Sequence, residues 1–182
     1  MNLPKIISLC RLLCVPVAIY LILNGLMLAA FWLFVAAGVS DAVDGYLAKR
    51  LGQTSTLGAY LDPIADKVLL VSVYATLGHA GHLPSWLVIL VVFRDLLIVG
   101  GVVLLHISND SVRMRPLLVS KINTVTQIAL AVLVLAELGF GFNIGIYHDL
   151  MIYLVAITTI ASGGAYIVSW GRNVETEGDD RP

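Results

Sequence analysis

Charged residues are scarce in this chain. Asp, Glu, Lys and Arg together make up 13% of its 182 residues, against about 25% in an ordinary soluble domain. The net charge is −1, so the overall balance offers nothing that would attract nucleic acid. Cysteine is also rare, and the spacing of Cys10 and Cys14 inside an apolar run fits neither a zinc site nor a redox motif. We interpret both as small buried apolar residues.

Apolar residues, in contrast, make up 59% of the chain. A helix that crosses a bilayer needs roughly 20 mainly apolar residues. The first run resembles a signal peptide, but it contains Arg11 and lacks a small-residue cleavage site, so we expect a retained helix. The sequence predicts an all-α integral membrane protein with one domain, residues 1–172, and a polar tail, residues 173–182, that is disordered. Its six transmembrane helices are expected near 6–23, 26–45, 59–78, 84–105, 122–138 and 150–170.

The basic residues fall on alternate connections of these helices. The expected cytoplasmic group is Lys5, Arg11, Lys49, Arg50, Lys67, Arg113, Arg115, Lys121, Arg172 and Arg181. The three other connections contain no Lys or Arg, and the asymmetry is complete except for Arg94, which lies inside the fourth expected helix. By the positive-inside rule both termini are cytoplasmic.

Four aspartates flank the connection between the second and third expected helices. Asp41 and Asp44 are three residues apart, and Asp62 and Asp66 are four apart, so each pair shares one helix face. The length of the apolar segments places all four at the inner leaflet or its surface, where unpaired charges are costly and mutually repulsive. The cluster is explained if divalent cations fill it, and oxygen ligands favour Mg²⁺, Mn²⁺ or Ca²⁺ over zinc.

Small and basic residues lie between these aspartates. Gly45, Ala48 and Gly58 allow a ligand to approach the backbone closely, and Lys49 and Arg50 add positive charge. Carboxylates, small residues and cations together indicate a site for a phosphate-rich ligand. The alternative is that the aspartates only cap helices or lie solvated in a loop.

The stretch 41–66 resembles the signature of the CDP-alcohol phosphotransferase family, D-x-x-D-G-x-x-A-R, eight residues, then G-x-x-x-D-x-x-x-D. One position departs from it, because Lys49 stands where the family usually has Arg. Lysine keeps the charge and loses the bidentate fork of arginine. Arg50 is the alternative contact for the pyrophosphate.

The resemblance implies a reaction and a set of roles. Such enzymes take a CDP-linked donor, usually CDP-diacylglycerol, join its phosphatidyl group to an alcohol and release CMP, and they are commonly homodimers with six transmembrane helices. Carried over by position, Asp41, Asp44, Asp62 and Asp66 bind two Mg²⁺ or Mn²⁺ ions, and Asp66 is also the general base. The residues implied to bind the donor nucleotide are Asp41, Asp44, Gly45, Ala48, Lys49 and Gly58.

The acceptor is indicated by shorter stretches. The opening 2–16 resembles bacterial glycerophosphate phosphatidyltransferases and CMP-forming cardiolipin synthases alike. Arg94-Asp95, the stretch 115–127 and the tail 165–172 are more similar to the cardiolipin type. Phosphatidylglycerol is therefore the expected acceptor, and glycerol 3-phosphate, which would give phosphatidylglycerophosphate, is the alternative.

Both acceptors carry a phosphate, so the site should hold fixed cations. The candidates are Arg94, Arg113, Arg115 and Lys121. Arg94 has an equally weighted alternative, a structural contact with Asp95 inside the bundle. For the three loop cations the alternative is ordinary topology, and Lys67 can simply neutralise the acidic cluster.

Two non-enzyme classes compete with this interpretation. A divalent-metal transporter would place carboxylates along a path across the bilayer, whereas these four lie at one edge. A structural protein would have no need of a dense acidic cluster. We therefore expect a lipid-synthesising enzyme of the bacterial inner membrane with a cytoplasmic active site, or of the mitochondrial inner membrane in a eukaryote.

Overall fold

The computed structural model describes residues 3–51, 56–107 and 118–178, and all six elements in these ranges are helices. Their bounds are α1 (Leu3–Leu23), α2 (Met27–Leu51), α3 (Thr56–His79), α4 (Ser85–Ile107), α5 (Leu118–Phe140) and α6 (Ile146–Gly178). Side chains are described for residues 10–41, 43, 67–100 and 118–168. The all-α class is confirmed.

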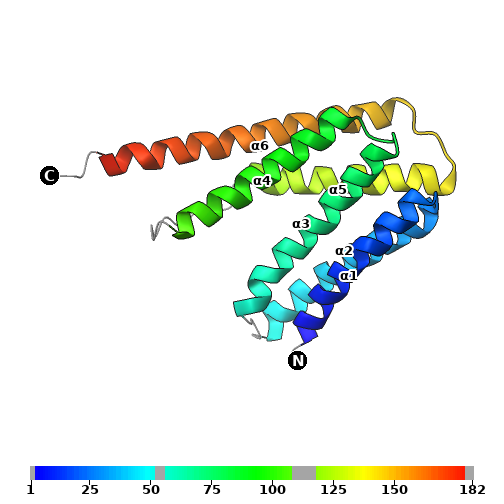
Figure 1. Ribbon diagram of the computed structural model, residues 1–182, viewed down its shortest axis with the longest axis horizontal. Helices are drawn as coiled ribbons and strands as arrows, with labels where there is room; N and C mark the ends of the chain where they lie inside the picture. The colour runs from blue at the N-terminus through cyan, green and yellow to red at the C-terminus, as the bar shows by residue number, and fades with distance from the viewer. Residues whose placement is uncertain (1–2, 52–55, 108–117, 179–182) are drawn as a thin grey trace.

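Three tight connections join α1 to α2, α3 to α4 and α5 to α6, as the glycine-containing breaks predict. Gly25, Gly81 and Gly141 have φ values of 72°, 80° and 72°, in the left-handed region that glycine adopts without steric cost. Figure 1 shows the three connections gathered at one end of the molecule, with the two chain termini away from it. The helices therefore alternate in direction, as an up-and-down bundle requires.

Two helices contact three others each: α3 contacts α1, α4 and α5, and α5 contacts α2, α3 and α6. Buried apolar side chains fill the centre of the bundle, among them Tyr74, Leu77, Leu87, Leu130 and Val155. Both motif helices, α2 and α3, contact α1 and α5, and these contacts fix them within the bundle.

The surface is more apolar than that of a soluble bundle. Large apolar side chains are exposed on all six helices, including Tyr20, Trp32, Ile89, Val125 and Ile157. Charged and amide side chains are buried instead, namely Arg11, Arg94, Asp95, Asn123 and Gln127. Polar groups facing inward and apolar groups facing outward form the pattern expected where the surroundings are lipid.

Two segments among the described side chains are long and apolar enough to cross a membrane, Leu118–Phe140 and Ile146–Val168. Shorter apolar segments occupy Cys10–Leu23 and Met27–Asp41. Length and composition alone do not distinguish such helices from buried ones, so the six spans and the cytoplasmic termini stay predictions.

Three helices extend well beyond the bounds that the sequence suggested: α2, α6 and α5, which occupies Leu118–Phe140 where 122–138 was expected. α6 continues past the expected end at 170 to Gly178, so residues 173–178 are helical where a disordered tail was expected. No proline or glycine interrupts residues 172–177, which explains the extension. Residues 179–182 lie outside the described part. α2 likewise continues to Leu51, past the predicted end near 45.

Candidate active site

The motif lies in two consecutive helices. Asp41 and Asp44 belong to α2, and Asp62 and Asp66 to α3, so the spacings of three and four residues are spacings along helices, as predicted. Asp41 is the one of the four whose side chain is described. The other motif residues lie outside the part of the chain whose side-chain surroundings are described: Asp44, Gly45, Ala48, Lys49, Arg50, Gly58, Asp62 and Asp66. Their binding and catalytic roles stay predictions.

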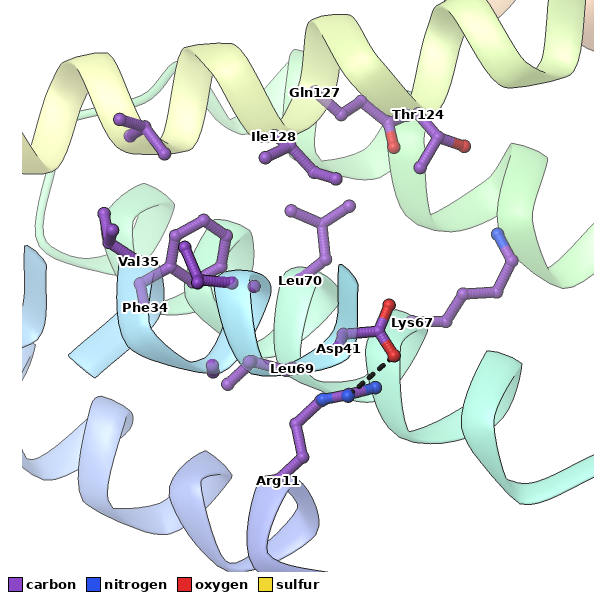
Figure 2. A pocket seen from close by; sticks show the side chains of 14 residues that line it. Arg11, Phe34, Val35, Asp41, Lys67, Leu69, Leu70, Thr124, Gln127 and Ile128 are labelled. Atoms are coloured by element: carbon purple, nitrogen blue, oxygen red, sulfur yellow. Dashed lines mark ion pairs between the residues drawn. The ribbon is translucent and has the colours of Figure 1, made fainter. Parts of the chain in front are cut away.

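Asp41 forms an ion pair with a residue from a different helix. Arg11 Nη2, on α1, lies 2.7 Å from Asp41 Oδ1 (Figure 2). The Arg11 side chain is 4% exposed and that of Asp41 is 40% exposed. A buried guanidinium thus fixes one oxygen of the first motif carboxylate, while the carboxylate still reaches open space.

A second ion-pair network begins beside the last motif aspartate. Lys67 follows Asp66 in α3, and its Nζ lies 2.9 Å from Asp95 Oδ1 on α4. The same oxygen lies 2.6 Å from Arg94 Nη1. Asp95 is buried, so one carboxylate oxygen serves two cations in the interior. The network ties the helix turn after Asp66 to α4.

The Arg94 guanidinium is surrounded by partners from three helices. Its Nε and Nη2 donate to Ser162 Oγ on α6 at 3.2 and 2.6 Å, and Nη2 also donates to Ser120 Oγ on α5 at 2.5 Å. With Asp95 at Nη1, every guanidinium nitrogen has a protein partner. These contacts support the structural alternative for Arg94, and acceptor-phosphate binding by it stays a prediction.

A cavity of about 690 Å³ opens between α1, α2, α3 and α5 next to Asp41. Its wall has two parts, which Figure 2 shows from close by. The polar part consists of Arg11, Asp41, Lys67, Thr124 and Gln127, and the larger part is apolar, with Phe34, Val35, Leu69, Leu70, Ile128 and Val132 among its residues. The cavity therefore suits an amphiphilic ligand with an apolar body and a polar end.

Arg94 and Lys121, the two predicted phosphate contacts whose side chains are described, do not line this cavity. Lys121 is exposed near the start of α5, and Arg113 and Arg115 lie outside the described residues. Their predicted role in acceptor binding is therefore untested.

A sequence model of the CDP-alcohol phosphatidyltransferase family matches residues 1–162. The chain belongs to this family. The match covers all of α1 to α5 and about half of α6, so it includes both motif helices and the cavity.

Similar proteins carry two different names. The rice chloroplast CDP-diacylglycerol–glycerol-3-phosphate 3-phosphatidyltransferase 1 is 37% identical over 93% of this chain and 57% of its own length. The rat CMP-forming cardiolipin synthase is 31% identical over 91% of this chain and 60% of its own length. A Bacillus subtilis CDP-diacylglycerol–glycerol-3-phosphate 3-phosphatidyltransferase is 30% identical over 91% of this chain and 93% of its length. The chain thus spans about three-fifths of the rice and rat proteins.

The carboxylate oxygens beside the cavity are ligands of the kind that suits a divalent cation. Asp41 offers carboxylate oxygens at 40% exposure beside the cavity, and hard oxygen donors suit Mg²⁺ and Mn²⁺. Among the described side chains no three His, Cys, Asp or Glu residues form a metal-binding group. The other three predicted ligands lie outside that set, so the two-metal site stays a prediction.

Three residues that line the cavity received no role in the site from the sequence: Arg11, Lys67 and Gln127. The sequence assigns Arg11 only to the topology and Lys67 only to neutralisation of the acidic cluster, and Gln127 is the last residue of the stretch 115–127 that resembles the cardiolipin type. A charged residue inside an apolar run was the available signal for Arg11, because such a charge needs a partner. For Lys67 the partner is on another helix, which no spacing rule reaches.

Proposed function

We propose that this chain is an integral membrane enzyme that transfers the phosphatidyl group of CDP-diacylglycerol to an alcohol and releases CMP. The acceptor we propose is phosphatidylglycerol, so the product is cardiolipin. Family membership and the motif in α2 and α3 support the reaction class. The observation that carries the choice of a lipid acceptor is the cavity beside Asp41, with its largely apolar wall.

The proposed membrane arrangement has six spans, with both termini and the motif on the cytoplasmic side. The outward apolar surface and the buried charges support insertion. The basic residues on alternate connections support the orientation. In a bacterium this is the inner membrane, and in a eukaryote it would be the mitochondrial inner membrane. The homodimer implied by the family resemblance is part of the proposal.

The reaction is a displacement at phosphorus. The acceptor hydroxyl oxygen forms a bond to the phosphorus of the phosphatidyl group, the bond from that phosphorus to the bridging pyrophosphate oxygen breaks, and CMP leaves with the electron pair. Asp66 accepts the hydroxyl proton. Mg²⁺ or Mn²⁺ held by the four aspartates would supply charge stabilisation for the pyrophosphate. The chain itself mostly positions the reactants.

Binding roles follow the order of residues along the two helices. Gly45, Ala48 and Gly58 lie on the side of the motif nearer the 52–55 connection, and we assign them to the nucleotide, together with Lys49. The cavity lies on the other side, beside residues that precede Asp41 and follow Asp66. A lipid acceptor approaching from there would bring its hydroxyl toward Asp66, the proposed base.

Glycerol 3-phosphate is the second candidate acceptor, and the 37% identity with the rice protein favours it. It is small and wholly polar, so the apolar part of the cavity would offer it no partners. A divalent-metal transporter is the alternative of another class. It would need acidic groups across the bundle, whereas the motif aspartates all flank one connection.

The test is CMP release by purified protein with CDP-diacylglycerol and Mg²⁺ or Mn²⁺, with phosphatidylglycerol and glycerol 3-phosphate as parallel acceptors. We expect turnover with phosphatidylglycerol and loss of turnover on chelation with EDTA. Turnover confined to glycerol 3-phosphate would keep the reaction class and exclude the proposed acceptor. Metal uptake into vesicles without CMP release would favour the transporter.

A further inference from the structure

Gln127 has a side-chain amide nitrogen that no described part of the fold uses. The residue is 1% exposed, and among the described residues its Nε2 has no hydrogen-bond partner. A buried donor without a partner costs about 1–3 kcal/mol, and most buried polar atoms in proteins avoid that cost. An apolar residue would serve the fold better at this position, so the amide requires another explanation.

The position of Gln127 is fixed by its backbone. The hydroxyl of Tyr74, a fully buried residue of α3, donates to the Gln127 carbonyl oxygen at 2.9 Å. This contact joins α3 to α5 one turn after Thr124. The backbone of Gln127 is therefore held in place, and its side chain lies on the wall of the cavity.

The amide shares the polar part of the cavity with two other groups. Figure 2 shows Gln127 and Thr124 extending from α5 toward the side on which Lys67 rises from α3. The third group is the ammonium of Lys67, which has three N–H donors and contacts the carboxylate of Asp95. An amide donor, a hydroxyl and an ammonium at one end of an apolar cavity suit an anionic oxygen carried by an apolar molecule.

We infer that Gln127 donates a hydrogen bond to the phosphodiester of the acceptor phospholipid, and that it helps the enzyme to select a lipid acceptor. This inference rests on the proposed function. A free phosphate ester would leave the apolar wall without a partner. The acceptor is favoured over the donor lipid because Lys67, in the polar part of the cavity, directly follows the proposed base Asp66.

The decisive variant is Gln127→Met, which keeps the length of the side chain and removes the donor. We expect the KM for phosphatidylglycerol to rise roughly tenfold to a hundredfold, as for a lost hydrogen bond to a charged group. The KM for CDP-diacylglycerol should stay within twofold, and resistance to unfolding in SDS should be unchanged or higher. Gln127→Glu, with a carboxylate facing the phosphate, should lose more than Gln127→Met.

The matched control is Thr126→Val on the same helix. Thr126 Oγ1 lies 3.0 Å from Thr158 Oγ1 and does not line the cavity. Its removal should lower stability slightly and leave both KM values unchanged. If Gln127→Met lowered stability without changing the phosphatidylglycerol KM, the amide would be structural and the inference wrong.

The inference and the proposed function fail in different ways. If wild-type protein released no CMP with any acceptor, the proposed function would fail, and native mass spectrometry would still report whether Gln127→Met weakens phosphatidylglycerol binding. If wild type is active and Gln127→Met raises only the donor KM, the cavity belongs to the donor lipid and the inference is overturned. An equal rise for glycerol 3-phosphate would remove the claim of lipid selection.

Discussion

Replacement of Asp95 by Asn should destabilise the bundle more than replacement of either cation that contacts it. Asp95 Oδ1 accepts from Lys67 and Arg94, while Oδ2 has no partner among the described residues. The amide nitrogen of an asparagine can therefore occupy the Oδ2 position without displacing a cation. The variant removes the charge and keeps the shape, so its effect reports on the charge.

The magnitude follows from what each variant leaves behind. Asp95→Asn leaves Arg94, which is 3% exposed, without a counter-charge among the described residues, and an uncompensated buried charge costs about 3–5 kcal/mol. Arg94→Met leaves the Lys67–Asp95 pair intact and removes hydrogen bonds to two serines, which should cost about 2–3 kcal/mol. Lys67→Met removes a pair whose cation is 32% exposed, so about 1 kcal/mol or less is expected.

The assay is SDS-induced unfolding of purified protein in mixed micelles, followed by circular dichroism. Asp149→Asn is the control, because Asp149 is exposed near the start of α6, and a change within about 0.5 kcal/mol is expected. A loss for Arg94→Met as large as that for Asp95→Asn would refute the charge argument. Unchanged stability of Arg94→Met with a raised acceptor KM would instead support acceptor-phosphate binding by Arg94.

Three other predictions follow from single positions. Asp66→Asn should abolish CMP release while CDP-diacylglycerol binding, followed by native mass spectrometry, largely survives; near-normal turnover would remove the assignment of the base. Lys49→Arg should leave kcat within a fewfold, because the charge is kept, and a large loss would mean that the pyrophosphate is bound in a different way. Gly139→Ala should lower stability by about 1–3 kcal/mol, because its Cβ would lie 2.9 Å from Leu28 Cα, whereas the control Gly100→Ala has open space and should be neutral or stabilising.

The sequence predicted the helices and their connections well, because length, apolar content and glycine position act locally. The break at Gly25 and the start of α4 after Pro84 are examples. The end of α6 was predicted poorly, since a polar segment without proline or glycine can continue a helix as readily as it can leave one. Hydropathy marks the membrane boundary of a helix and carries little information on where the helix itself stops.

The site was predictable where its chemistry is encoded in short spacings. Asp41 and Asp44 lie one helical turn apart, so their common face follows from the sequence. The partner of Asp41 does not follow from it, because Arg11 lies thirty residues earlier on another helix. The same limit explains why the sequence left two interpretations of Arg94 open, acceptor-phosphate binding and a structural contact with Asp95. Ser120 and Ser162 decide its environment, and they come from helices whose packing no local pattern specifies.

The two ion-pair systems place fixed positive charge at both ends of the motif. Arg11 reaches the first aspartate from α1, and Lys67, held by Asp95, stands beside the last one. Arg11 belongs to α1, and Lys67 is paired with Asp95 on α4. The position of the motif therefore depends on how α1 and α4 pack against α2 and α3. Contacts then continue from Asp95 through Arg94 to Ser162 on α6. A change at Ser162 should therefore alter catalysis through Lys67, even though Ser162 does not line the cavity.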